Sequence, residues 1–162
     1  MTGLTVSGPP IRATVERGQP AAAAVPRPEV ETIRRPYTFA ATVPAAGSDV
    51  LLMGERLREN ARVVHISVDF ADGVAQELLV YPIISFADAP AVVGVDEYTP
   101  YEYLLEGPMH YLAGDDVIWR LDVAIPAPEG TFLGFRAVNE NAASELTYRA
   151  VLVTEESYRV SA

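Results

Sequence analysis

The sequence predicts an all-β protein: an antiparallel β-sandwich or jelly roll preceded by an extended N-terminal arm. From Tyr37 onward, short runs of alternating apolar and polar residues are separated by turn residues, and no segment has convincing amphipathic helical periodicity. The first 36 residues hold six of the 13 prolines and no aromatic residue, which predicts the arm. A chain of 162 residues without cysteine is long enough to bury one core unaided by disulfides.

The expected strands lie at the spacing of a sandwich with seven or eight strands. The clearest is 62–70, where Val64, Ile66, Val68 and Phe70 alternate toward one face. The Asp-Gly pair that follows predicts a hairpin turn into a strand at 74–81, which Pro82 ends or places at a sheet edge. The other expected strands span residues 37–43, 49–53, 101–105, 117–123, 131–138 and 145–153.

The strand at 117–123 is expected to carry a large part of the core. Val117, Trp119, Leu121 and Val123 alternate with polar residues, so we predict that Trp119 is buried between the two sheets. The domain organisation that follows is an arm at 1–36, a sandwich at 37–156 and a short tail at 157–162.

Charge is divided between the arm and the sandwich. Residues 1–36 carry five arginines and three glutamates, a net charge of +2. The whole chain carries −10, so residues 37–162 carry −12. The net acidity argues against binding to nucleic acid or to an anionic membrane. A floppy tail is one interpretation of the arm. The other is an extended segment that binds a neighbour through these apolar and basic residues: Ile11, Arg12, Val15, Arg17, Val25, Arg27, Val30, Ile33, Arg34 and Arg35.

Residue types that carry catalysis are sparse. The sequence has two histidines, His65 and His110, and lacks a nucleophile-elbow, phosphate-loop or histidine zinc motif. The aspartate pairs 115–116 and 69/72 offer too few oxygens for the six to eight that calcium takes. We therefore predict no catalytic residue, no cofactor and no metal site.

Tyrosines gather in one loop-rich stretch, at Tyr98, Tyr101, Tyr103 and Tyr111. Aromatic side chains with a polar tip suit a protein interface, the closure of a core by a loop, or the stacking of a sugar. We name them as a possible interface and leave the other two interpretations open.

Residues 54–156 resemble the β-sandwich structural proteins of tailed-virus particles, of the capsid decoration or cement type. The segments that carry the resemblance are GERLRENARVVHISVDFADGVAQELLVYP, LAGDDVIWRLDVAIPAPEGTFLGFRAVNE and AASELTYRAVLVTEE. The resemblance implies a non-enzymatic protein of the virion, assembled in the host cytoplasm. It also implies an arm that crosses a neighbouring subunit.

We therefore expect a decoration protein that forms a homo-oligomer and binds the major capsid protein or other virion subunits. One alternative is a turret, tail or baseplate component of the same kind of virion. A second, from another class, is a carbohydrate-binding module that uses the tyrosines as its platform. A third is an enzyme of jelly-roll type, which the absence of a histidine cluster opposes.

Overall fold

The computed structural model describes residues 29–86, 101–108 and 110–160, and these form strands, turns and loops without a helix. No helix long and apolar enough to cross a membrane occurs among these residues. The strands are β1 (Val30–Val43), β2 (Asp49–Arg56), β3 (Ala61–Phe70), β4 (Leu78–Ser85), β5 (Tyr101–Tyr103), β6 (Val117–Ala127), β7 (Phe132–Asn139) and β8 (Leu146–Arg159).

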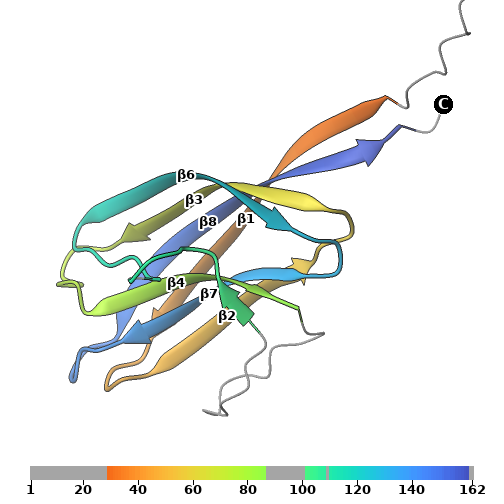
Figure 1. Cartoon of the computed structure of the whole chain (residues 1–162). Helices are drawn as coiled ribbons and strands as arrows, with labels where there is room; N and C mark the ends of the chain where they lie inside the picture. The colour runs from red at the N-terminus through yellow and green to blue at the C-terminus, as the bar shows by residue number, and fades with distance from the viewer. Residues whose placement is uncertain (1–28, 87–100, 109, 161–162) are drawn as a thin grey trace, which may run out of the picture.

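The strands form two antiparallel sheets that face each other (Figure 1), as the sequence predicts. Sheet A has the order β1-β8-β3-β6 and sheet B the order β2-β7-β4-β5. Strand neighbours are therefore nested, with the first strand beside the last, β2 beside β7, β3 beside β6 and β4 beside β5. A long two-stranded ribbon rolled onto itself gives this order, which identifies the sandwich as a jelly roll.

The core lies between the sheets and comes from one alternating face of each strand. Its largest fully buried side chains include Phe70, Phe135, Tyr148 and Leu152. Phe39 and Phe135 meet edge to face across the two sheets, with ring centroids 5.2 Å apart. The alternation in the sequence thus becomes an inner and an outer face, because successive side chains of a strand point to opposite sides.

Strand β3 departs from simple alternation at one residue. The pairing with β6 and β8 shifts between Val63 and His65, so Val64 is the extra residue of a β-bulge. Val63, which strict alternation places on the polar face, is fully buried, whereas Val64 is only half-buried. A bulge reverses the facing of the residues before it, and a sequence pattern with period two does not reveal it.

The Asp-Gly turn does not make the predicted hairpin. The segment after Phe70 crosses from sheet A to sheet B, and the next strand begins at Leu78. Gly73 donates its amide proton to Asp115 Oδ1 at 2.8 Å, which fixes the turn against the loop before β6. Tertiary hydrogen bonds therefore stabilise a crossover where local turn chemistry alone favours a hairpin.

Pro82 does not end its strand, because β4 continues to Ser85. The Pro82 carbonyl accepts from the amide of Leu104 at 2.9 Å, on the side of β5. Pro82 has no N–H, and the hydrogen bond that it cannot donate would lie on that same side, where β5 pairs with only three residues of β4. The longer ladder with β7, which includes Pro82, is therefore left without a gap.

Trp119 is not buried, contrary to the sequence-based prediction. Its side chain lies on the inner face, opposite Val68, as the alternation predicts, yet it is 41% exposed. The reason is the position of β6 at the edge of sheet A, whereas β5, at the corresponding edge of sheet B, is only three residues long. The inner face of β6 thus extends beyond the strands that could cover it.

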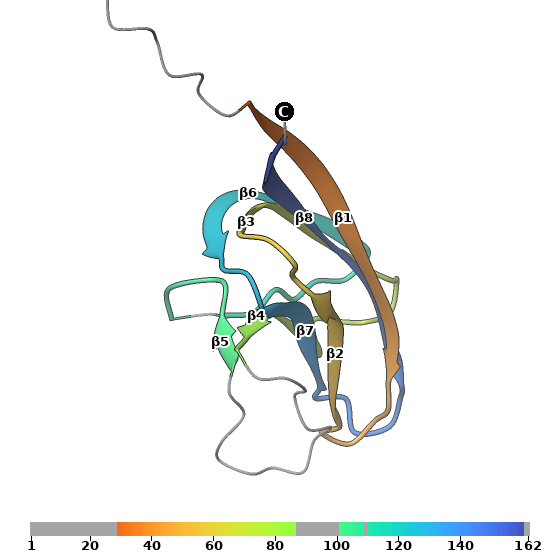
Figure 2. The same ribbon diagram turned by 90° about the vertical axis from the view of Figure 1, so that its right-hand side faces the viewer.

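Strand β1 begins earlier than expected and strand β8, its antiparallel partner, ends later than expected. β1 begins at Val30 instead of Tyr37, and β8 runs to Arg159 instead of Val153. Figures 1 and 2 show that the paired ends project past the rest of the sandwich. Residues 30–36 of the predicted arm thus belong to this projecting ribbon of β1 and β8 residues.

Candidate functional site

The residues predicted to bind a partner divide into two groups. Ile11, Arg12, Val15, Arg17, Val25 and Arg27 lie outside the described residues. Val30, Ile33, Arg34 and Arg35 lie on β1 in the projecting ribbon. The two arginines have carboxylate partners on β8 of the same chain, at 3.5 Å from Glu155 for Arg34 and 3.5 Å from Glu156 for Arg35.

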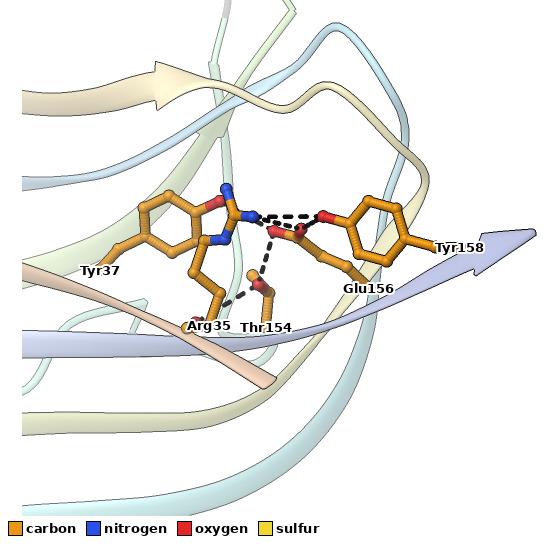
Figure 3. Close-up of polar contacts among 5 residues, drawn as sticks. All are labelled: Arg35, Tyr37, Thr154, Glu156 and Tyr158. Atoms are coloured by element: carbon orange, nitrogen blue, oxygen red, sulfur yellow. Dashed lines mark hydrogen bonds and ion pairs between the residues drawn. The ribbon is translucent and has the colours of Figure 1, made fainter. Parts of the chain in front are cut away.

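Glu156 is the centre of the polar contacts that hold the ribbon together (Figure 3). It is 4% exposed, and Tyr37 donates its hydroxyl proton to Glu156 Oε1 at 2.9 Å. Tyr158 donates to the other carboxylate oxygen, and Arg35 provides the opposite charge. The Thr154 hydroxyl lies 3.3 Å from Glu156 Oε1 and 3.4 Å from the Arg35 carbonyl, and it donates to one of them at a time.

These side chains occupy the same face of the strand pair as the core. In the β1–β8 register, Tyr37 pairs with Leu152, Arg35 with Thr154 and Ile33 with Glu156. The inner face therefore changes from apolar to polar as the ribbon leaves the sandwich. Hydrogen bonds to a carboxylate replace hydrophobic contacts at this point and hold β1 and β8 in register, while β3 pairs with β8 as far as Glu156.

The environment of Glu156 favours its charged form. Burial by itself would raise the pKa of Glu156, but the hydrogen bonds from Tyr158 and Tyr37, with the Arg35 charge, outweigh burial and lower that pKa. The reciprocal interaction with Glu156 raises the pKa of Arg35. Glu59, in the loop before β3, adds a negative charge that contributes to the raised pKa of Tyr158, after its hydrogen bond to Glu156 and burial.

Sequence reasoning did not identify the Glu156 cluster. A signal was present, because Leu152, Thr154, Glu156 and Tyr158 continue the alternation of the last predicted strand. Polar residues at core-facing positions ended the predicted strand too early. Only the pairing with β1 shows that these polar groups satisfy one another.

Apolar side chains remain exposed on the ribbon. Val30 is 54% exposed and Ile33 is 42% exposed, and Val160, just past β8, is 44% exposed. Along the described residues β1 pairs only with β8, so its other edge presents unpaired backbone groups. An edge of this kind is suited to the addition of a strand from another chain.

The tyrosines of the loop-rich stretch form a cluster on the outer face of sheet B. Tyr98 lies outside the described residues, whereas Tyr101 and Tyr103 belong to β5 and Tyr111 follows it. Tyr81 of β4 contacts both Tyr103 and Tyr111, with ring centroids 5.3 and 5.4 Å away. His110 stacks on Tyr103 at 4.8 Å, which extends the cluster.

Arg136 on β7 anchors this cluster to the sheet. Its Nε donates to Asp49 Oδ2 at 2.8 Å, and its Nη1 donates to the Tyr103 hydroxyl at 3.1 Å. Its guanidinium also lies 5.5 Å from the centroid of the Tyr81 ring. The hydrogen bond to Asp49 raises the pKa of Arg136, so the guanidinium is a fixed positive charge under the aromatic rings.

A surface hollow of about 520 Å³ lies beside the inner face of β6. Trp119, Tyr111, Leu105 and Leu112 contribute its apolar lining. The indole nitrogen of Trp119 donates to the Ala113 carbonyl at 2.8 Å, which fixes the orientation of the ring. The exposed tryptophan and the hollow were not predicted, because the edge position of β6 is a property of the sheet order.

Both histidines and one of the candidate aspartates, Asp115, have structural contacts. His65 Nδ1 lies 2.8 Å from Asp122 Oδ1 across β3 and β6, and His110 Nδ1 lies 2.8 Å from the Leu105 carbonyl. Asp115 accepts from the Gly73 amide in the crossover turn. In the described part of the chain, no group of three or more His, Cys, Asp or Glu side chains could hold a metal ion.

No protein-family model matches the chain, and no curated protein sequence matches it either. Among solved structures it is similar to a chain of infectious bursal disease virus, Gx strain, at a TM-score of 0.43 and 13% identity, covering 82% of this chain and 32% of that one. A chain of the VP2 subviral particle of the same virus gives a TM-score of 0.41 and 13% identity, covering 82% of this chain and 33% of that one.

A chain of the Gt strain gives a TM-score of 0.35 and 16% identity, covering 84% of this chain and 37% of that one. The present chain thus spans about a third of the length of these viral chains. These three viral chains do not test the tailed-virus type.

Proposed function

We propose that this chain is a non-enzymatic structural protein of a virus particle, of the capsid decoration or cement type. It binds the particle surface and neighbouring subunits through the projecting ribbon of β1 and β8 and through residues 1–28, which precede it. The major capsid protein, other virion subunits and further copies of this chain are the partners that such a role requires.

The ribbon is the observation that supports this proposal. Beyond Glu156, where the pairing of β3 with β8 ends, β1 and β8 form a two-stranded ribbon, which is marginally stable in water and needs additional stabilisation. Here the buried Glu156 cluster provides it, and the exposed Val30 and Ile33 offer apolar area next to a free strand edge. A rigid ribbon with an apolar surface and an open edge is suited to docking on another subunit.

The jelly roll by itself does not select this function. Jelly rolls occur in viral capsid proteins, in lectins and in cupins, and a fold does not determine an activity. The exposed apolar side chains of the ribbon, and the edge of β1 that is unpaired among the described residues, support an interaction role. His65, His110 and Asp115 make structural hydrogen bonds. A turret, tail or baseplate component would use the same ribbon, and the position of the protein on the particle distinguishes these roles.

The test is binding of the purified protein to particles of a virus that encodes it, measured by co-sedimentation. Ile33→Glu is expected to reduce occupancy at least about tenfold, because it places a charge in the docking surface. Ile118→Glu is the matched control, since Ile118 is 50% exposed on β6 of the same sheet, away from the ribbon. Equal occupancy for both variants, or no binding by the unmodified protein, would contradict the proposal.

Carbohydrate binding is a second candidate function, favoured by one observation. Trp119 is 41% exposed beside Tyr111 in a hollow, and an exposed indole next to polar groups is a platform on which a sugar can stack. Binding on a glycan array that disappears in Trp119→Ala would support this function. Particle binding that depends on Ile33 together with a blank glycan array would exclude it.

A further inference from the structure

The hollow beside Trp119 has an apolar base. The Trp119 N–H already donates to the Ala113 carbonyl, so what the ring offers a ligand is its hydrocarbon surface. Leu105 and Tyr111 continue this surface from the segment after β5. A ligand that fits here brings flat or compact apolar groups of its own.

The rim of the hollow is acidic. Glu106 and Glu140 are exposed at its border and Gln76 adds an amide, whereas the described lining residues include no arginine. The hollow therefore attracts a cationic ligand, and an arginine side chain can pair with a carboxylate and also stack on the indole. An apolar ligand with positive charges is the chemistry that satisfies both features.

Residues 1–28 of this chain have that composition. They contain five prolines and no aromatic residue, with three arginines and one glutamate, a net charge of +2 beside −12 for residues 29–162. Arg27 lies between two prolines in the segment Pro26–Pro28, and Arg12 follows two prolines and one isoleucine in the segment Pro9–Arg12. Aromatic-lined grooves bind proline-rich segments because the polyproline helix is preformed and loses little entropy on binding.

The direction of β1 favours a second copy as the source of this segment. Trp119 and Ala150 both pair with Val68, so they lie at the same height in sheet A. Val30, at the start of β1, pairs with Arg159, which is nine residues further along β8 than Ala150. That separation is about 30 Å. The β1 end at which residues 1–28 join points away from its own sandwich (Figure 1), and proline-rich segments are stiff.

We infer that the hollow formed by Trp119, Tyr111 and Leu105, with Glu106 and Glu140 at its rim, binds residues 1–28 of a second copy of this chain. The inference rests on the proposed function, because it names the neighbouring subunit's surface that the arm would engage. It predicts that the full-length protein self-associates head to tail, with one copy's arm in the next copy's hollow.

The fluorescence of Trp119 reports whether the hollow is occupied, because Trp119 is the only tryptophan in the chain. The experiment measures sedimentation velocity and acrylamide quenching of the full-length protein over a range of concentrations. We expect self-association to shield Trp119, so that quenching falls as concentration rises. A synthetic peptide of residues 1–28 should compete, dissociating the oligomer while keeping Trp119 shielded.

Three variants make the test specific. Trp119→Ala should weaken self-association at least about tenfold, as removal of a central aromatic contact does. The double variant Glu106→Gln and Glu140→Gln alters only exposed carboxylates, so it keeps the fold and should weaken self-association several-fold. Ile118→Ala is the matched control, since Ile118 is adjacent on the opposite face of β6 and 50% exposed, and it should associate like the unmodified protein.

Three results would overturn the inference. In the first, self-association is unchanged in both the Trp119 and the glutamate variants. In the second, Trp119 is shielded equally at all concentrations in a monomer, which places the chain's own arm in the hollow. In the third, an array glycan shields Trp119 while the peptide does not, which makes the hollow a sugar site. Failure of particle binding with hollow-dependent self-association intact would remove the proposed function and leave this inference standing.

Discussion

Replacing Tyr37 by phenylalanine tests whether the Glu156 cluster stabilises the fold. The change removes one hydroxyl, which donates to Glu156 Oε1 at 2.9 Å, and keeps the ring that packs against the core. A hydrogen bond to a charged group contributes about 1.5–3 kcal/mol to stability. We expect Tyr37→Phe to lower the free energy of unfolding by about that amount at pH 7, measured by urea unfolding.

Tyr148→Phe is the matched control. Tyr148 lies on β8 and faces the core, it is 1% exposed, and its hydroxyl has no hydrogen-bond partner among the described residues. Burial raises the pKa of Tyr148, as expected for a hydroxyl that meets no charge. Removing this hydroxyl relieves a buried polar group of its desolvation cost, so stability should stay constant or rise.

The pH dependence of the Tyr37→Phe effect distinguishes a charged cluster from simple packing. The pKa of Glu156 is lower in the folded protein than in the unfolded chain, so its contribution is present above the unfolded value of about 4.3 and is lost as pH falls through the folded value. Protonation leaves a neutral hydrogen bond, worth about 0.5–1.5 kcal/mol. The Tyr37→Phe penalty should therefore shrink below pH of about 4.

Two outcomes would refute this reasoning. If Tyr37→Phe and Tyr148→Phe change stability equally, the hydrogen bond to Glu156 contributes nothing specific. If the Tyr37→Phe penalty is constant between pH of about 3 and 7, the carboxylate charge is not what the hydroxyl stabilises.

Two further predictions concern the ends of the chain and the core. Deleting residues 1–28 should leave the thermal unfolding midpoint within a few degrees of the full-length value, whereas deleting residues 1–36 should lower it markedly. The longer deletion removes Arg35 and seven of the 14 residue pairs between β1 and β8, and equal midpoints would contradict this. Phe135→Ala should cost about 3–5 kcal/mol in urea unfolding. Trp119→Ala should cost less, because Trp119 is 41% exposed and Phe135 is fully buried, and the reverse order would contradict the placement of β6.

The strand at 62–70 shows what alternation predicts and where it stops. Ile66, Val68 and Phe70 are buried as expected, because a period of two follows from the geometry of any strand. Val63 is buried against expectation, because the bulge at Val64 depends on the pairing with β6 and β8. The information that places the bulge lies in strands distant in the sequence.

The candidate sites show the same division. The sequence pointed to Ile33, Arg34, Arg35 and the tyrosines by composition, and it placed Trp119 on the correct face of its strand. It did not reveal the Glu156 cluster, since Tyr37 and Glu156 are 119 residues apart and meet only through the β1–β8 register.

The sequence by itself determined the fold class, the approximate strands and the contrast between a basic proline-rich beginning and an acidic sandwich. Those properties follow from residue periodicity and composition, which are local. Only the tertiary structure decided which strands form the edges, and hence that Trp119 is exposed and that β1 and β8 continue as a ribbon. The physical reason is that burial and hydrogen-bond satisfaction depend on which strand lies alongside or opposite, and that neighbour comes from a distant part of the chain.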